Sequence, residues 1–308
     1  MQIPDWIGPY KVGPLIGSGI MGCVYLCTRE IETEDGALLI DSVAIKVPSD
    51  ENSDYHVQLL HHEGAVGRHM WHRNLVAVRE VILLDAGLPA VVMEYVEGSL
   101  LDALVQKVEV LQALEIVRQV AVGLEWFHTR RDGATPLQGV HNDVKTANVF
   151  ISNSGVVRLF DYSIADHTYR GRRAGTGLTQ GTPVNMSPEQ ARDQEVDFHS
   201  DLFALGTLLY QLIFHRFPFY KRTLQETLMM IAFADSGPHV EEVRVNYPNF
   251  PDLASLLDRC WMKDPYRRPD SAINVAFALE MIIRQVQEHG GLPCAPVCLL
   301  PLLTNNTT

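Results

Sequence analysis

The most informative segment of the chain reads His141-Asn142-Asp143-Val144-Lys145-Thr146-Ala147-Asn148, and strand-like residues flank it. One short loop thus holds a potential general base, a cation and an amide that can ligate a metal ion. Asp143 can orient an attacking hydroxyl and accept its proton, Lys145 can neutralise phosphoryl oxygens, and Asn148 can hold Mg²⁺. A polar loop without catalytic function can contain the same residues, so the interpretation needs support from elsewhere in the chain.

A further carboxylate, Asp161, follows the mostly apolar run from Val156 to Phe160 and therefore lies at the end of a predicted strand. Its hard oxygens suit Mg²⁺ that bridges two phosphate groups. An aspartate at a strand end is also common in ordinary turns. Asp161 is therefore a candidate metal ligand rather than an assigned one.

A glycine-rich segment near the N-terminus reads Gly17-Ser18-Gly19-Ile20-Met21-Gly22-Cys23-Val24 between two strand-like runs. Such glycines can turn a hairpin whose backbone N–H groups approach phosphates without interference from Cβ atoms. A dinucleotide-binding fold would have a helix directly after the third glycine, whereas another strand-like run follows here. A plain glycine-rich turn gives the same pattern.

A single lysine ends the strand-like run Val43-Ala44-Ile45-Lys46, and its ammonium group suits two adjacent phosphates. Such a lysine needs an acidic partner, and Glu63 in the helix-like residues 55–70 is the best placed. A solvated lysine and an ordinary surface glutamate are the alternatives, because Gly64 and Gly67 weaken that helix.

Strand-like and helix-like patterns divide the chain into two parts. Before residue 96 one helix-like stretch accompanies the strand-like residues 10–15, 23–28, 42–47, 76–83 and 90–95. After residue 100 helical periodicity dominates, at residues 111–128, 201–214 and 273–287. We therefore expect an α+β fold made of an N-lobe (10–93) with an antiparallel sheet and one main helix, a hinge (94–98), a mainly helical C-lobe (99–290), and a disordered tail (291–308).

Composition narrows the possible partners and compartment. The 308 residues are 46% hydrophobic, and 37 acidic against 25 basic residues give a formal charge of -12. This balance argues against nucleic acid as a partner. Five cysteines without disulfide or zinc spacing suit a reducing compartment, which we expect to be the cytoplasm. Neither a signal peptide nor a membrane span is expected, and the sequence carries no signal for oligomeric state.

In this order and at these intervals, the motifs resemble the signature set of protein kinases across residues 10–287. The resemblance implies a two-lobed protein kinase fold over residues 1–290, ATP and Mg²⁺ as cofactors, and protein substrates. It implies Asp143 as catalytic base with Lys145 beside it, Lys46 paired with Glu63, and Asn148 and Asp161 as metal ligands. It also implies a set of nucleotide-binding residues, in which Met93 guards the back of the adenine pocket: Ile16, Gly17, Ser18, Gly19, Gly22, Val24, Ala44, Lys46, Met93, Glu94 and Val96.

Downstream, Gly181-Thr182-Pro183-Val184-Asn185-Met186-Ser187-Pro188-Glu189-Gln190 resembles the substrate-docking loop and the Ala-Pro-Glu motif of the family, with serine in place of alanine. The resemblance implies a structural ion pair between Glu189 and Arg268, and an aspartate, Asp201, that braces the catalytic loop through its backbone. Lys145 together with Thr182 resembles the serine/threonine branch, so Ser and Thr hydroxyls are the expected acceptors.

Two departures from the family pattern affect the functional prediction. Asn142 replaces the arginine that usually receives an activation-loop phosphate, so we expect phosphorylation at Thr176 or Thr179 not to be strictly needed. Tyr162-Ser163 replaces phenylalanine and glycine, so the segment after Asp161 is expected to change conformation less readily. Because Lys46, Asp143, Asn148 and Asp161 are all present, we expect an active serine/threonine kinase. The departures support the alternative, a pseudokinase that acts as a nucleotide-binding or partner-binding scaffold; a small-molecule kinase ranks last.

Overall fold

The computed structural model describes residues 3–19, 22–50, 53–84, 87–132, 135–136, 139–162, 165, 183–290 and 297–304. The chain forms two compact units, one made of Met1–Glu97 with Asp161–Ile164 and the other of Gly98–Phe160 with Ala165–Thr308. The boundary between Glu97 and Gly98 falls within the segment where the sequence places a hinge. Across the described residues, no helix combines the length and apolar character needed to cross a membrane.

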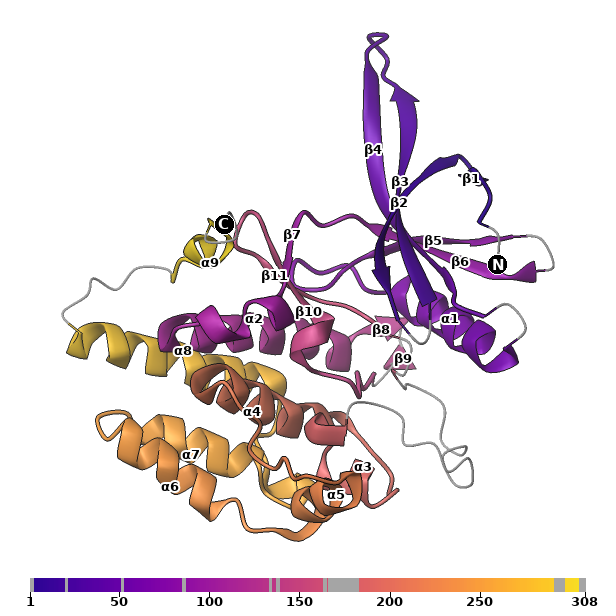
Figure 1. The fold of residues 1–308 in the computed structure, drawn as a ribbon. Helices are drawn as coiled ribbons and strands as arrows, with labels where there is room; N and C mark the ends of the chain where they lie inside the picture. The colour runs from indigo at the N-terminus through magenta and orange to yellow at the C-terminus, as the bar shows by residue number, and fades with distance from the viewer. Residues whose placement is uncertain are drawn as a thin grey trace. The chain divides into compact units, whose positions relative to one another are not determined.

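The first unit is built on a six-stranded sheet with the strand order β1-β2-β3-β4-β6-β5, in which every neighbouring pair is antiparallel. Its strands, drawn in indigo and violet in Figure 1, are β1 (Trp6–Ile7), β2 (Tyr10–Ser18), β3 (Gly22–Glu32), β4 (Leu38–Pro48), β5 (Val78–Leu83) and β6 (Pro89–Glu94). The expected antiparallel sheet is thus present, but β3 and β4 are much longer than the sequence pattern indicated.

Alternation along β4 places two kinds of side chain on opposite faces of this sheet. Val43, Ile45 and Val47 are fully buried in a core cluster with residues of the neighbouring strands. Ala44 and Lys46 consequently point to the other face. The orientation of Lys46 is therefore set by the alternating apolar residues around it.

Helix α1 (Asp54–Gly67) packs against this sheet at close range. Ser53 begins it as N-cap and accepts a hydrogen bond from the backbone N–H of His56. A Cβ atom at Gly64 would overlap Val81, and one at Gly67 would overlap Val78. The two glycines cost helix propensity, as the sequence suggested, but they let the helix that carries Glu63 approach the sheet closely.

The second unit is mainly helical, as expected. Its first helix, α2 (Val110–Thr129), packs against α4 (Phe198–Phe214) and α8 (Ala272–His289), and all three bury an apolar face. The remaining helices are α3 (Pro188–Ala191), α5 (Leu224–Phe233), α6 (Gly237–Asn246), α7 (Pro251–Cys260) and α9 (Leu300–Thr304) (Figure 1). They surround a buried core to which α4 contributes residues on almost every side.

Short strands at one end of this unit position the catalytic loop. An antiparallel sheet of order β11-β10-β7 joins β7 (Gly98–Leu100), β10 (Val149–Ser152) and β11 (Val157–Leu159). A separate pair, β8 (Arg131–Asp132) with β9 (Thr135–Pro136), precedes the loop. Two of the predicted catalytic residues, Asp143 and Lys145, thus follow helix α2 and precede strand β10 in the chain.

The C-terminal tail differs in part from the disordered segment expected over residues 291–308. Residues 297–304 include the short helix α9, in which Leu302 is buried together with the preceding Leu299. Both leucines remove apolar surface from water, which stabilises an ordered arrangement. The remaining residues of the tail lie outside the described part of the chain.

Candidate active site

In the first unit, a buried lysine lies between two carboxylates. The Lys46 ammonium on β4 is 2.6 Å from Glu63 Oε2 on α1 and 3.2 Å from Asp161 Oδ1. Lys46 and Glu63 are buried, which makes their electrostatic interaction stronger than that of a surface pair. The Lys46–Glu63 pair expected from the sequence is present, and Asp161 joins it.

The surroundings shift the pKa values of this pair. Burial alone would lower the pKa of Lys46, but the carboxylates of Glu63 and Asp161 outweigh it and raise the pKa. Lys46 is therefore a permanent cation at neutral pH. Burial raises the pKa of Glu63, and the attraction of Lys46 opposes this effect only in part. Lys46 is thus held by Glu63 and also contacts the carboxylate of Asp161.

Tyr162, which stands where the family has phenylalanine, is buried and hydrogen-bonded within the first unit. Its ring is buried, and its hydroxyl donates a 2.9 Å hydrogen bond to the carbonyl oxygen of Val76. A phenylalanine would lack this bond. The contact supports the expectation that the segment after Asp161 changes conformation less readily; Ser163, the second departure, lies outside the described residues.

The predicted nucleotide-binding residues of the first unit gather on one sheet face. Strand register places Val24 directly opposite Lys46, and Ala44 directly opposite Met93. Because Ala44 and Lys46 are two residues apart, all four side chains lie on the face opposite the core cluster.

The glycine-rich turn and the end of β6 lie on the same sheet. Gly17 pairs with Val24, and Gly19 N–H donates to the Gly22 carbonyl oxygen at 2.9 Å. Ile16 and Ser18 belong to β2, Glu94 ends β6 and Val96 follows it, while Ile20 and Met21 lie outside the described residues. The glycines therefore turn a β-hairpin and do not precede a helix, which excludes the dinucleotide-fold interpretation.

In the second unit, the catalytic loop holds the Asp143 carboxylate in place. Lys145 Nζ donates to Asp143 Oδ2 at 2.7 Å, and Asn148 Nδ2 donates to the same oxygen at 2.9 Å. Asn148 Nδ2 also donates to the Asp143 carbonyl oxygen at 2.8 Å. Because its amide nitrogen is used in these bonds, Asn148 presents its side-chain oxygen as the group that can ligate a metal.

Asp201 at the start of α4 braces this loop through its backbone. Its two carboxylate oxygens accept the N–H groups of His141 and Asn142, each at 2.8 Å, and the His128 ring nitrogen lies 2.8 Å away. Asn142 has a φ of 68°, a left-handed conformation that only short polar residues and glycine adopt at low cost. A buried carboxylate therefore fixes the backbone just before Asp143, as the resemblance implied.

A residue that the sequence reasoning did not single out, Gln190, contacts the same loop. Its side-chain nitrogen donates to the Asn142 carbonyl oxygen at 3.1 Å, and its side-chain oxygen accepts the Ser187 N–H at 2.8 Å. Ser187 and Gln190 form the capping box of α3. The signal was present in the sequence, because serine followed by glutamine three residues later marks a helix start. Gln190 links α3 to the catalytic loop without any charged group.

A buried ion pair with Arg268 holds Glu189 of helix α3 in place. Arg268 donates to both carboxylate oxygens of Glu189, at 2.6 and 2.7 Å, and to the His199 carbonyl oxygen at 2.8 Å. Burial alone would raise the pKa of Glu189, but the guanidinium group of Arg268 outweighs this effect and lowers the pKa below its usual value. The expected pair is therefore present; residues 181–182 of the docking loop lie outside the described residues.

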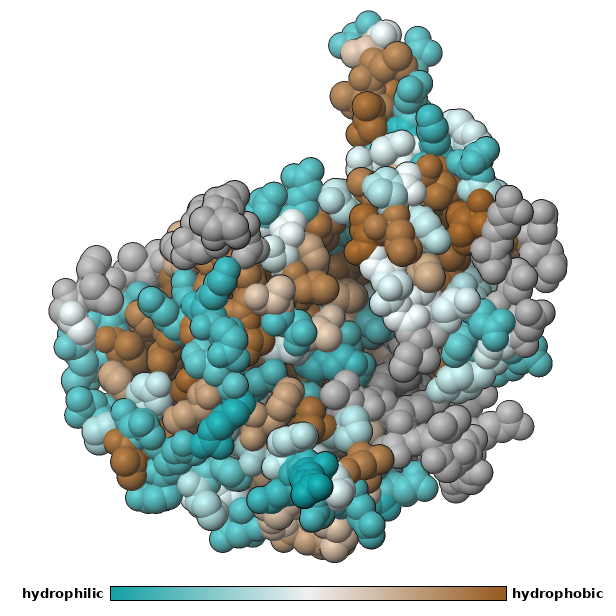
Figure 2. Space-filling view, viewed as in Figure 1, coloured by the Kyte–Doolittle hydropathy of each residue, from teal (hydrophilic) through white to brown (hydrophobic). Residues whose placement is uncertain are grey.

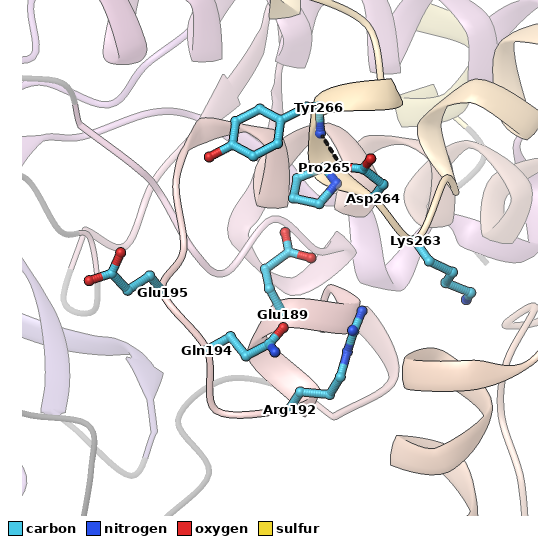
Figure 3. Close-up of a pocket in the computed structure, with 8 residues that line it drawn as sticks. All are labelled: Glu189, Arg192, Gln194, Glu195, Lys263, Asp264, Pro265 and Tyr266. Carbon is cyan, nitrogen blue, oxygen red and sulfur yellow. Dashed lines mark hydrogen bonds between the residues drawn. The ribbon is translucent and has the colours of Figure 1, made fainter.

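A hollow of about 600 Å³ borders this ion pair (Figure 3), and none of the predicted catalytic residues line it: its wall consists of Glu189, Arg192, Gln194, Glu195, Lys263, Asp264, Pro265 and Tyr266. Burial lowers the pKa of Lys263 to about 8. The Lys263 side chain points away from the other lining residues in Figure 3 and donates to the Ile231 carbonyl oxygen at 2.7 Å. The hollow therefore shares no lining residue with the predicted catalytic site.

Comparison with known proteins identifies the family. The model of the protein kinase domain matches residues 10–281. The chain belongs to the protein kinase domain family. Serine/threonine-protein kinase A from Synechocystis sp. is 27% identical, over 90% of this chain and 54% of its own length.

Other kinases show a similar degree of likeness. Serine/threonine-protein kinase PksC from Streptomyces coelicolor is 32% identical, over 86% of this chain and 47% of its own length. Tyrosine-protein kinase MasK from Myxococcus xanthus is 27% identical, over 93% of this chain and 45% of its own length. This protein kinase chain spans about half the length of the curated relatives it matches.

Proposed function

We propose that this chain is an ATP-dependent protein serine/threonine kinase. The observation that carries the proposal is the orientation of the Asp143 carboxylate by Lys145 and Asn148, in a loop that Asp201 and Gln190 hold. Phosphoryl transfer depends mainly on positioning and on charge stabilisation, and this loop supplies a base and a cation in fixed positions. The presence of Lys46 in an ion pair with Glu63 further supports an active kinase.

In the proposed reaction, Asp143 accepts a hydrogen bond from the hydroxyl of the protein substrate. The hydroxyl oxygen forms a bond to the γ-phosphorus of ATP while the bond from that phosphorus to the bridging oxygen of ADP breaks. The hydroxyl proton passes to Asp143. Lys145 neutralises negative charge on the transferred group, and Lys46 binds the phosphates that leave with ADP.

Mg²⁺ is the metal that suits the proposed ligands. The side-chain oxygen of Asn148 and the carboxylate of Asp161 are hard donors of the kind that this ion prefers. When bound, the ion would neutralise charge on the β- and γ-phosphates. Asp161 is partly exposed, unlike Glu63, so the metal role falls to Asp161 and the lysine-holding role to Glu63.

Serine and threonine are the proposed acceptors because Lys145 directly contacts the base, as the resemblance to the serine/threonine branch implies. Two of the relatives named above carry serine/threonine-kinase names and one a tyrosine-kinase name. The proposal therefore needs a direct test of the acceptor. The five cysteines have neither disulfide nor zinc spacing, so we place the site of action in a reducing compartment such as the cytoplasm.

Phosphoamino-acid analysis tests the acceptor. Labelled ATP and Mg²⁺ are incubated with the chain and a mixture of basic proteins, and the labelled products are hydrolysed. We expect phosphoserine and phosphothreonine that disappear in Lys145→Met. Phosphotyrosine alone would overturn the acceptor assignment. Absence of label with nucleotide binding intact would replace the enzyme with a pseudokinase scaffold.

A further inference from the structure

The hairpin formed by β3 and β4 extends beyond the rest of its sheet (Figure 1). Its two strands stay in continuous register from the Gly22↔Pro48 pair to the Glu32↔Leu38 pair. Strand β2 accompanies β3 only as far as Thr28, and β6 accompanies β4 only from Val43 onward. Residues 29–42 therefore form a two-stranded ribbon, called the ribbon below, with strand edges on both sides.

The outer edge of β4 presents backbone hydrogen-bonding groups. At the tip, Thr33 N–H donates to the Ala37 carbonyl oxygen at 2.8 Å, which makes this a hydrogen-bonded pair. Hydrogen-bonded and non-hydrogen-bonded pairs alternate along an antiparallel ladder. Leu38 and Ile40 therefore direct their N–H and C=O groups away from β3. Among the described residues, no strand pairs with β4 there.

The side chains along this edge are apolar and exposed. Leu38 is 67% exposed and Ile40 is 71% exposed, and the register places both on one face. Leu39, on the opposite face, is 56% exposed. Figure 2 shows a brown, hydrophobic patch on the projecting hairpin. An exposed, apolar strand edge of this kind is a template for pairing with another chain.

The β3 edge of the ribbon carries charged residues that disfavour pairing with another strand. Glu30 and Glu32, on β3, lie directly opposite Ile40 and Leu38. The β3 edge is therefore disfavoured by its glutamates, although Ile31 between them is 38% exposed, whereas the β4 edge carries three consecutive exposed apolar residues.

The base of the ribbon is fixed, so the edge exists before any partner arrives. Asp41 accepts hydrogen bonds from Arg29 at 2.8 Å and from Arg79 of β5 at 2.7 Å. Arg29 also lies over the ring of Tyr10, 5.0 Å from its centroid. A preorganised edge lowers the entropy that a partner loses on binding.

We propose that the outer edge of β4 along residues 38–42 is a docking site that adds an extended segment of a partner protein as a further strand. Strand addition would satisfy the outward backbone groups, and alternate side chains of the added segment would cover Leu38 and Ile40. The ribbon carries Arg29 as its one basic residue and the acidic residues Glu30, Glu32, Glu34, Asp35 and Asp41. The partner segment therefore alternates apolar with basic residues.

Charge also decides against a second copy of the chain as the occupant. Two ribbons paired edge to edge would bring their acidic residues together, and like-charge juxtaposition disfavours association. A basic segment is attracted to the acidic residues of the ribbon, and this attraction is strongest at low salt. The proposal commits to a basic strand from another protein, and self-association is an outcome that the experiment must exclude.

The test selects binding peptides from a random dodecapeptide display library on the full chain. Ile40→Pro serves as one edge variant, since proline removes the outward N–H and the exposed isoleucine side chain while the ladder to β3 loses no donor. Leu38→Lys serves as a second variant that keeps every backbone group. Leu39→Lys adds the same charge on the opposite face and is the matched control. Thermal unfolding verifies that each variant is folded.

We expect wild-type selections to enrich peptides in which Lys or Arg alternates with Val, Ile or Leu. A synthetic peptide of the enriched sequence should bind at least tenfold more weakly to Ile40→Pro and Leu38→Lys, and within threefold of wild type to Leu39→Lys. Binding should weaken as salt rises. No enrichment, or enrichment that both edge variants retain, would overturn the proposal. A concentration-dependent dimer in sedimentation that Ile40→Pro abolishes would assign the edge to a second copy instead.

Discussion

Replacing Asp201 with asparagine should uncouple the catalytic loop from helix α4. The carboxylate accepts the N–H groups of His141 and Asn142 at 2.8 Å and is almost fully buried. An asparagine keeps one oxygen but points an NH₂ group at one of these donors. The loss of one charge-assisted hydrogen bond, together with a buried donor left unpaired, predicts a stability loss of about 3–5 kcal/mol.

Catalysis should suffer beyond this loss of stability. The left-handed φ of Asn142, 68°, is held by the bond that Asp201→Asn disturbs, so the loop relaxes and Asp143 moves. A displacement of about 1 Å at a reacting group costs about 100-fold in rate. Urea unfolding gives the stability, and initial rates are measured where the variant is folded.

Asp193→Asn makes the same chemical change at an exposed residue that also has a positive φ, 55°, and is the control. It should unfold within about 0.5 kcal/mol of wild type, as surface substitutions usually do. If Asp201→Asn also unfolds that close to wild type and keeps the full rate, the bracing role of the carboxylate is refuted.

Three further changes test other parts of the account. Gly67→Ala places a methyl group against β5, so it should lower the free energy of unfolding in urea by about 1–3 kcal/mol. It should also lower activity, because the helix that carries Glu63 is displaced. A variant as stable as wild type would show that the helix does not approach β5 closely. Tyr162→Phe removes the hydrogen bond to the Val76 carbonyl oxygen and should lower the free energy of unfolding by about 1 kcal/mol. A melting temperature equal to that of wild type would contradict this. The double variant Thr176→Ala/Thr179→Ala should keep most of its kinase activity, since Asn142 offers no cation to a phosphate; loss of nearly all activity would contradict this.

Sequence patterns predicted the parts of the fold in which one physical signal dominates. Alternating apolar residues around Lys46 identified β4, and helical periodicity identified α2, α4 and α8 close to their observed bounds. The loop from His141 to Asn148 was recognised because catalysis requires its residue types at short spacing. Glu63 was proposed as the partner of Lys46 because a buried lysine needs a nearby carboxylate. The pair of Glu189 and Arg268 followed only from the family resemblance, because these two residues lie far apart in the chain.

Other features depend on tertiary contacts that no local pattern reports. Gly64 and Gly67 indicated a weak helix, whereas the structure shows that they permit close packing on β5. The extension of β3 and β4 was missed because residues 29–42 mix charged and apolar side chains without a clean alternation. Gln190 was overlooked as a contact of the catalytic loop, although its capping-box spacing was visible. Leu299 and Leu302 ordered part of a tail whose prolines suggested disorder.

The most direct test of the kinase assignment is phosphoryl transfer from labelled ATP and Mg²⁺ to a generic basic protein and to the chain itself. Wild type is compared with Asp143→Asn, which removes the proposed base, and Lys46→Met, which removes the phosphate-binding cation. The account predicts incorporation by wild type that both variants lose while their unfolding transitions remain cooperative. Equal incorporation by wild type and Asp143→Asn, or none by wild type while nucleotide still binds, would contradict it.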